Sequence, residues 1–320
     1  MNTINSDEIT RIKSYLHKTG LFYSGADNFE YEVITDRPDK IKYMITIDNH
    51  KYVLDILKNN KENENIVSGM AVQRYLSNQD MAAIPFYIEP TGEFTLTEYL
   101  DNYESLDNID IKDQNVEEIL TQFTEIEKAL HSQESPSNES LFNNLKNGKF
   151  IENLNGFIKD GLLNVDEANS VVNYINNNYS VFSEPIVMKH SDIQPGNILY
   201  NKETGKVKLI DFEFAGYGGS MYDWACFYST MPTEYISKMD EDILKNPMFK
   251  FFVFDFNLRR VSYLTKDINE LKSKVDIKDE KSVKEFEEKY KELKTRYLKA
   301  KDTYKKVIDE IKKETVKIKV

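Results

Sequence analysis

Two short segments in the C-terminal half of the chain carry the side chains best suited to chemistry. The first reads HSDIQPGN and places His190 before a carboxylate, Asp192, and an amide, Asn197. The second reads LIDFE and ends an apolar run at Asp211. Phosphoryl transfer needs one carboxylate that accepts the proton of the attacking hydroxyl, and further oxygen ligands that hold Mg²⁺. The residue types and spacing of the two segments predict this chemistry.

Both segments resemble the catalytic and metal-binding motifs of the aminoglycoside phosphotransferase and choline kinase superfamily, the small-molecule relatives of protein kinases. The resemblance implies that Asp192 is the catalytic base, that Asn197 and Asp211 hold Mg²⁺, and that His190 supports the loop. It covers about residues 30–230. It also implies an α+β, two-lobed protein-kinase-like fold, with a small β-rich N-lobe and a larger helical C-lobe that carries a long C-terminal helix.

The same resemblance indicates how a phosphate donor, ATP or GTP, would bind. The stretch from Phe94 to Leu100 is similar to the last N-lobe strand and the hinge of the superfamily. Its backbone would then hold the purine, which makes Glu98 and Leu100 the expected contacts to the base. The loop that holds the catalytic carboxylate differs slightly from the superfamily, which usually has Gly where this chain has Ser191.

The phosphate-binding part of the N-lobe departs from the superfamily. The third strand usually carries a cation where this chain has Asp55, and Gly69 stands where a partner Glu is expected. A two-residue turn at 49–50 would place Lys42 on the same sheet face as Asp55 and diagonal to it, so Lys42 is predicted to contact phosphate. Lys40, at the mouth of the loop, is the second candidate. An active enzyme with a relocated cation and a pseudokinase with a degenerate N-lobe both remain open.

Aromatic and acidic side chains follow the second motif closely. Among them, Glu213, Tyr217 and Trp224 are the predicted contacts of the phosphate acceptor. Aromatic faces beside carboxylates suit a cationic acceptor such as choline or ethanolamine, although most of these rings could equally belong to the core. The prediction is therefore a kinase that phosphorylates a hydroxyl of a small cationic molecule. An aminoglycoside-type antibiotic phosphotransferase is the alternative.

Hydrophobic patterning predicts the elements that position these residues. The first hundred residues should form a small sheet with an inserted helix: helices over 7–19 and 63–78, strands over 30–35, 41–48, 51–57, 84–89 and 93–99. The rest should be mainly helical, over 115–132, most of 139–178 and beyond Tyr222, with short strands over 186–188, 198–200 and 207–210. We expect three domains: an N-lobe over 1–99, a C-lobe over 100–265 and a charged helix over 266–320.

Composition limits the class of protein. The chain has 320 residues, with 42 Lys and Arg against 54 Asp and Glu, and the resulting net charge of −12 disfavours nucleic acid as a partner. A single cysteine excludes an intrachain disulfide. The sequence shows no apolar run long enough to span a membrane and no apolar core of a signal peptide near its N-terminus, so we expect a cytoplasmic protein that does not bind membranes.

The last segment carries a heptad-like stripe. Of the 55 residues from 266 to 320, 31 are charged, and the apolar positions between Val283 and Ile311 step alternately by three and four. Such a stripe could pack on the chain's own helical lobe. It could also form a homodimer through a coiled coil, and the sequence leaves both interpretations open.

Overall fold

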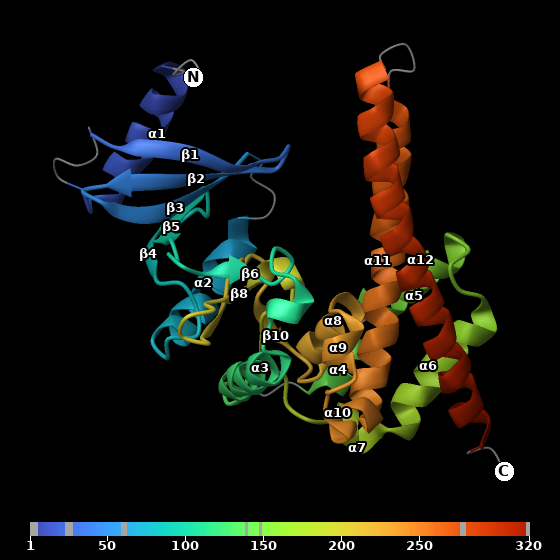
Figure 1. The fold of residues 1–320 in the computed structure, drawn as a ribbon. Coiled ribbons are helices and arrows are strands. Elements are labelled where there is room, and N and C mark those ends of the chain that lie inside the picture. The colour runs from blue at the N-terminus through green and yellow to red at the C-terminus, as the bar shows by residue number, and fades with distance from the viewer. Residues whose placement is uncertain are drawn as a thin grey trace. The chain divides into compact units, whose positions relative to one another are not determined.

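The computed structural model describes six stretches of the chain: residues 6–22, 28–58, 63–137, 140–146, 149–275 and 280–317. The chain forms two compact units, the first from Met1–Leu130 with His190–Gly216 and the second from His131–Lys189 with Tyr217–Val320. The first contains most of the strands and the second most of the helices (Figure 1). The predicted α+β class is confirmed, and the predicted division into three domains stays a prediction.

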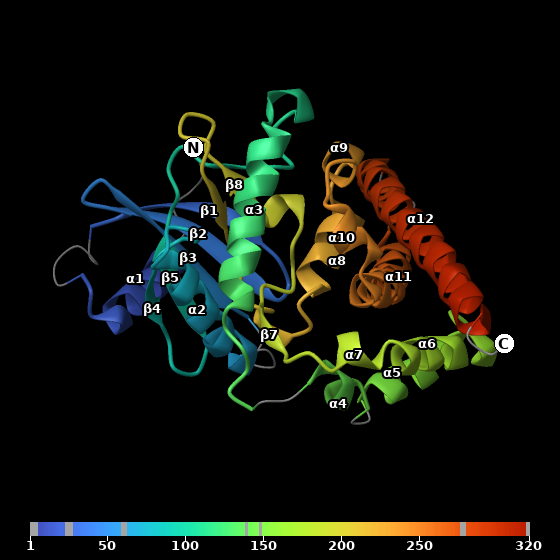
Figure 2. The same ribbon diagram turned by 90° about the horizontal axis from the view of Figure 1, so that it is seen from below.

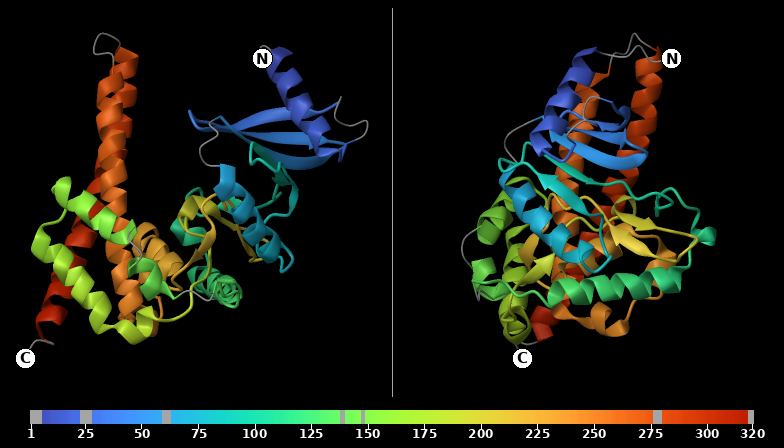
Figure 3. Two further views of the ribbon diagram at one scale, coloured as in Figure 1. Left: turned by 180° about the vertical axis from the view of Figure 1, so that it is seen from behind. Right: turned by 90° about the vertical axis from the view of Figure 1, so that its left-hand side faces the viewer.

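A five-stranded antiparallel sheet organises the first unit. Its strand order is β1-β2-β3-β5-β4. The strands are β1 (Glu30–Asp36), β2 (Lys40–Ile47), β3 (His50–Leu57), β4 (Pro85–Ile88) and β5 (Phe94–Glu98). Helices α1 (Ser6–Thr19) and α2 (Asn63–Ser77) lie on opposite sides of this sheet (Figure 3). Every predicted element of the first hundred residues is therefore present.

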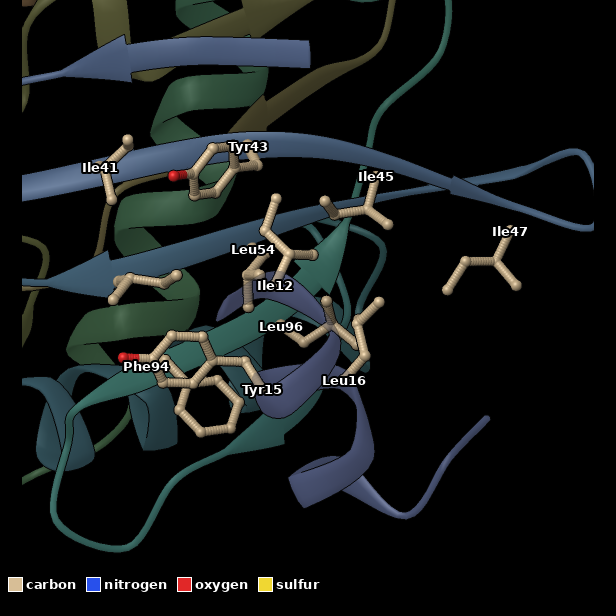
Figure 4. Packing of buried hydrophobic residues seen from close by; sticks show 11 residues of the cluster. Ile12, Tyr15, Leu16, Ile41, Tyr43, Ile45, Ile47, Leu54, Phe94 and Leu96 are labelled. Atoms are coloured by element: carbon tan, nitrogen blue, oxygen red, sulfur yellow. The ribbon is translucent and has the colours of Figure 1, made fainter. Parts of the chain in front are cut away.

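One face of this sheet forms the core of the first unit. Alternate residues of β2, from Ile41 to Ile47, are buried against the apolar side of α1, where Ile12 and Leu16 are fully buried (Figure 4). Since successive side chains of a strand point to opposite faces, the other alternate residues of β2, beginning with Lys40 and Lys42, face away from α1. The core of the sheet thus determines which face of β2 presents its lysines.

The turn between β2 and β3 lies one residue earlier than predicted. Asp48 and Asn49 form it, with φ angles of 50° and 63°. Two-residue hairpin turns that match the right-handed twist of the strands require positive φ angles at both positions. Lys42 consequently lies directly opposite Asp55 instead of diagonal to it. The predicted turn at 49–50 was wrong, because Asp and Asn adopt the left-handed conformation more readily than His does.

A second, three-stranded sheet in the first unit carries the chemical motifs. Its order is β6-β8-β9. The elements of this part are β6 (Glu104–Ser105), β8 (Ile198–Tyr200), β9 (Val207–Leu209), the short 3-10 helices η2 (Ile111–Asp113) and η3 (Pro195–Asn197), and α3 (Val116–His131). Ala82 forms an isolated parallel bridge to Leu209, so the segment that follows α2 lies beside the strand that leads to Asp211.

The second unit is a helical assembly. Its helices are α4 (Leu141–Lys146), α5 (Lys149–Lys159), α6 (Val165–Asn177), α7 (Tyr179–Phe182), α8 (Tyr222–Thr230), α9 (Thr233–Ile236), α10 (Glu241–Lys245), α11 (Pro247–Lys274) and α12 (Glu280–Lys317). Strands β7 (Val187–Lys189) and β10 (Gly216–Gly218) form a two-stranded sheet. Short strand β10 was not predicted, because a three-residue strand of Gly, Tyr and Gly has no hydrophobic pattern.

The charged C-terminal helix packs within its own unit. Helix α12 runs alongside α11, and its C-terminal part lies against α6 (Figure 2). Ala300, Tyr304 and Ile311 of the apolar stripe are buried there, and the Tyr304 hydroxyl donates to the carbonyl of Leu162 (3.2 Å). The stripe thus packs on the chain itself, while the homodimer stays a prediction. None of the helices in the described stretches is apolar enough over a sufficient length to cross a membrane.

Candidate active site

The loop that follows β7 is fixed by His190. This side chain is completely buried, and its Nδ1 accepts a hydrogen bond from the backbone N–H of Asp192 (3.3 Å). Its Nε2 therefore carries the proton and donates to the carbonyl of Ile210 (2.9 Å). His190 thus ties the loop to the residue just before Asp211, and so holds the two motifs at a fixed distance from each other.

Two amide side chains orient the carboxylate of Asp192. Gln194 Nε2 (3.0 Å) and Asn197 Nδ2 (2.8 Å) both donate to Asp192 Oδ2. Among the described residues, these donors leave Oδ1 as the oxygen that can accept the proton of a hydroxyl. Gln194 was not predicted as a site residue, although its place between the Asp and the Asn of the motif could have suggested a positioning role.

Both motifs contain a residue in the left-handed region of backbone conformation. Ser191 has a φ of 75° and Asp211 a φ of 66°. This conformation costs a residue other than glycine roughly 1–2 kcal/mol, which explains why the superfamily can favour Gly at the position of Ser191. Backbone strain of this kind concentrates at functional sites, and here it lies next to Asp192 in the first motif and at Asp211 itself in the second.

Two lysines of β2 surround the carboxylates of the second motif. Lys42 Nζ lies 3.2 Å from an oxygen of Asp211 and 3.2 Å from an oxygen of Asp55. Lys40 Nζ lies 2.8 Å from both carboxylate oxygens of Glu213 and 3.4 Å from Asp211 Oδ1. Lys40 was expected at the mouth of the loop, yet its side chain is only 2% exposed. The structure therefore brings Lys40, Lys42, Asp55, Asp211 and Glu213 together as one ionic network.

The protonation states of this network follow from its charges. Burial raises the pKa of Asp211, but the ammonium groups of Lys42 and Lys40 outweigh it and hold that pKa at about 2. Burial and the neighbouring Asp211 raise the pKa of Glu213 above its ordinary value. Burial lowers the pKa of Lys42, and the carboxylates of Asp211 and Asp55 more than compensate, so the net shift is upward. Asp211 and Lys42 are consequently charged at neutral pH.

A cavity of about 350 Å³ within the first unit opens onto this network. Its apolar wall includes Ile34, Val53, Leu100, Leu199 and Ile210. Its polar end is lined by Lys42, Asp55, Asp211 and Glu213. An apolar slot that ends in charged groups is typical of a small-molecule site, and the volume lies within the usual range of about 300–1,000 Å³.

The predicted hinge residues also line the cavity. Glu98 and Leu100 both lie in its wall. The Glu98 carboxylate accepts a hydrogen bond from the backbone N–H of Ile84 (3.1 Å), so this side chain stabilises the strand pairing. At the polar end, Asp55 Oδ1 is buried and has no hydrogen-bond partner among the described residues.

Gly69 occupies the position where a partner glutamate was expected, for a steric reason. A Cβ atom on Gly69 would lie 1.9 Å from the carbonyl oxygen of Phe212, which stands between Asp211 and Glu213. Helix α2 thus approaches the second motif so closely that only glycine fits. This contact gives no local signal in the sequence, because the two segments are far apart along the chain.

The remaining predicted acceptor contacts lie in the second unit. Tyr217 is 42% exposed, whereas Trp224 is 5% exposed. The Trp224 ring packs edge-on against Phe227, with ring centroids 5.9 Å apart. The buried ring of Trp224 has the surroundings of a core residue. The acceptor roles of these residues stay predictions.

The donor atoms suit a metal ion that is bound jointly with phosphate. No group of three or more His, Cys, Asp or Glu side chains within the described ranges forms a ready metal centre. Mg²⁺ is usually held by one or two carboxylates together with substrate phosphates, instead of by a cage made only of protein groups. Asp211 and the side-chain oxygen of Asn197 fit that role. The backbone N–H of Ile210 donates to the backbone carbonyl of Asn197 (3.1 Å), and this bond holds the two segments together.

Comparison with known proteins agrees with the resemblance of the motifs. The sequence is similar to "Probable ethanolamine kinase B" of Dictyostelium discoideum, with 33% identity over 99 residues, which are 30% of this chain and 22% of that protein. It is also similar to "Probable choline kinase 3" of Arabidopsis thaliana, with 35% identity over 72 residues, which are 22% of this chain and 19% of that protein. These alignments span about a fifth of the length of the curated relatives.

Solved structures show the same fold. An aminoglycoside phosphotransferase in complex with AMP-PNP and hygromycin B has a TM-score of 0.60 at 10% identity, covering 93% of this chain and 98% of its own. A choline/ethanolamine kinase family protein of Mesorhizobium loti has a TM-score of 0.57 at 10% identity, covering 94% and 99%. The predicted protein-kinase-like fold is therefore confirmed. The sequence profile of choline/ethanolamine kinases matches residues 24–251, most of the chain, and the chain thus belongs to the choline/ethanolamine kinase family.

Proposed function

We propose that this protein transfers the γ-phosphate of ATP or GTP, with Mg²⁺, to the hydroxyl of a small cationic amino alcohol such as ethanolamine or choline. The observation that carries this proposal is the oriented carboxylate of Asp192, which lies in the same compact unit as Asp211 and the cavity. Family membership supports the reaction class. The names of the matched relatives support the acceptor class.

The residues of the chain would divide the work as follows. The purine would lie in the apolar part of the cavity beside Leu100, and the phosphates would lie at the charged end beside Lys42. Mg²⁺, held by Asp211 and Asn197, would neutralise the charge that develops on the transferred group. Asp192 Oδ1 would accept the proton of the acceptor hydroxyl as its oxygen attacks the γ-phosphorus. The hydrogen bonds on Oδ2 keep the carboxylate in that orientation.

Lys42 would replace the missing cation of the third strand. It lines the cavity and lies beside both Asp55 and Asp211. A charge-assisted contact to phosphate is worth about 1.5–3 kcal/mol, or about 10- to 150-fold in affinity. Lys42→Ala should weaken nucleotide binding by that factor, as measured by calorimetry with Mg²⁺. Lys51→Ala is the matched control, because Lys51 lies on the adjacent strand β3, is 38% exposed and pairs with Asp101. Equal affinities in the two variants would contradict the role of Lys42.

The acceptor class can be tested directly. Transfer of a labelled γ-phosphate from ATP and from GTP should be measured with ethanolamine, choline and an aminoglycoside. The proposal predicts phosphorylation of an amino alcohol, and the carboxylate of Glu213 is the proposed contact to its cationic end. Phosphorylation of the aminoglycoside alone would favour the antibiotic phosphotransferase. The pseudokinase alternative would gain support if no acceptor reacted and if Mg²⁺ with nucleotide failed to stabilise the protein.

A further inference from the structure

The ammonium group of Lys40 has an unusual position for a lysine. It is the first residue of β2, and its side chain is only 2% exposed. Four carboxylate oxygens surround its Nζ: both oxygens of Glu213 at 2.8 Å, and Asp211 Oδ1 and Oδ2 at 3.4 and 3.5 Å. A buried ammonium is tolerated only where such partners replace water. Lys40 therefore sits where a cation bound by these two carboxylates would sit.

The geometry of Asp211 leaves little room for a second cation beside Lys40. One of its oxygens contacts both Lys40 and Lys42, and the other contacts Lys40. Among the described residues, Asp55, Asp211 and Glu213 bring three negative charges to the network, and the two lysines bring two positive ones. With Lys40 in place the network has a formal charge of −1, and without Lys40 the formal charge is −2. The charge of −2 favours the binding of a divalent cation.

We propose that Lys40 is an internal counter-ion that occupies the cation position at Asp211 and is displaced from Asp211 when Mg²⁺ binds with the nucleotide. The proposal rests on the proposed function, which makes Asp211 a metal ligand. Lys40 would be a positioning residue: it holds the two carboxylates together before the ligands arrive. The released ammonium then requires a new anionic partner, and the nucleotide phosphates provide one at the charged end of the cavity.

Two consequences follow from this competition. A metal ion alone should bind the wild-type protein weakly, because it must expel the ammonium of Lys40 without offering it a new partner. Metal and nucleotide together should bind much better, because the phosphates accept the displaced charge. Lys40 would thereby couple the two ligands, and the protein would bind free Mg²⁺ only weakly in the absence of its phosphate donor.

The test uses electron paramagnetic resonance to measure how tightly the protein binds Mn²⁺ in the absence of nucleotide. Lys40→Met keeps the apolar stem and removes the charge. It should bind Mn²⁺ about 10- to 150-fold more tightly than the wild type, the range that a charge-assisted contact contributes. Lys51→Met should leave Mn²⁺ binding unchanged, because Lys51 pairs with Asp101 and has no contact with the network. Unchanged or weaker Mn²⁺ binding by Lys40→Met would overturn the proposal.

A second variant guards against a failure to fold. Lys40→Gln keeps a hydrogen-bond donor near the two carboxylates and also lacks the charge. Mg²⁺ alone should raise its thermal unfolding midpoint more than it raises that of the wild type, because a ligand stabilises the state that it binds. An equal rise in both proteins would count against displacement.

Asp211→Ala separates this inference from the proposed function. If Asp211→Ala leaves metal-dependent nucleotide binding intact, Asp211 is not a metal ligand, and the metal site of the proposed function is wrong. If Asp211→Ala abolishes that binding while the Lys40 variants bind Mn²⁺ like the wild type, the metal site stands and only the role of Lys40 is refuted.

Discussion

Gly69→Ala tests whether α2 must approach the second motif as closely as the structure shows. Alanine stabilises a helix interior by about 1 kcal/mol over glycine. At Gly69, however, the new Cβ would lie 1.9 Å from the Phe212 carbonyl oxygen, whereas ordinary contact begins at 3.4 Å. The helix or the motif would therefore have to move by about 1.5 Å. Overpacking of this kind costs roughly 1–3 kcal/mol.

Gly156→Ala is the matched control. Gly156 lies in the interior of α5, and a Cβ there would meet nothing within 4 Å. Since the gain in helix propensity is the same in both variants, the difference between their effects isolates the overpacking cost. We expect Gly156→Ala to raise the free energy of unfolding by about 1 kcal/mol. Gly69→Ala should fall about 1–3 kcal/mol below that variant.

Urea unfolding followed by circular dichroism measures the stability of both variants, with each transition fitted separately. Nucleotide affinity in the presence of Mg²⁺ gives a second readout. It should fall in Gly69→Ala, because Phe212 lies between Asp211 and Glu213, and it should not change in Gly156→Ala. Equal stabilisation by both substitutions, with unchanged nucleotide affinity, would refute the close approach of α2.

Three further predictions concern the two motifs. Ser191→Gly should raise the free energy of unfolding by about 0.5–1 kcal/mol in urea titrations, because glycine adopts the left-handed conformation at little cost. A loss of stability would show that the serine side chain contributes more than the strain costs. Gln194→Ala should lower kcat about 10-fold or more without changing nucleotide affinity, because the carboxylate of Asp192 loses one of its two hydrogen-bond donors. An unchanged kcat would refute the role of Gln194 in orienting Asp192. Asp211→Asn should be less stable than the wild type at pH 5, and the difference should shrink as the pH falls from 3.8 through about 2. The folded-state pKa of Asp211 is below its ordinary value, so its stabilisation is present above 3.8 and is lost on acidification. A difference that did not change with pH in urea titrations would contradict the ionic network.

Much of the fold could be predicted because its signals are local. Alternating apolar residues marked the strands of the first sheet, and helical spacing marked α3 and the stripe of α12. The turn between β2 and β3 was misplaced by one residue, although Asp48 and Asn49 both favour positive φ angles and could have located it. The error shows that register depends on the turn as well as on the pattern of the strands.

The site was only partly predictable, because several of its contacts join distant segments. The motifs around Asp192 and Asp211 are continuous in sequence, and they revealed the chemistry. The burial of Lys40 against Glu213 joins residues 173 positions apart, and the contact of Gly69 with Phe212 depends on how α2 packs. No local pattern marks either contact, since both arise only when the sheet, the helix and the motif are assembled.

The most direct test of the central claim compares turnover and nucleotide binding in Asp192→Asn. The substitution keeps the size of the side chain and removes the carboxylate that would accept the proton. Phosphate transfer from ATP to the preferred amino alcohol should fall by about two to four orders of magnitude, the usual contribution of a general base. Calorimetry should show nucleotide binding with Mg²⁺ that is close to the wild type. Full transfer activity in Asp192→Asn would contradict the assignment of Asp192 as the base and, with it, the proposed mechanism.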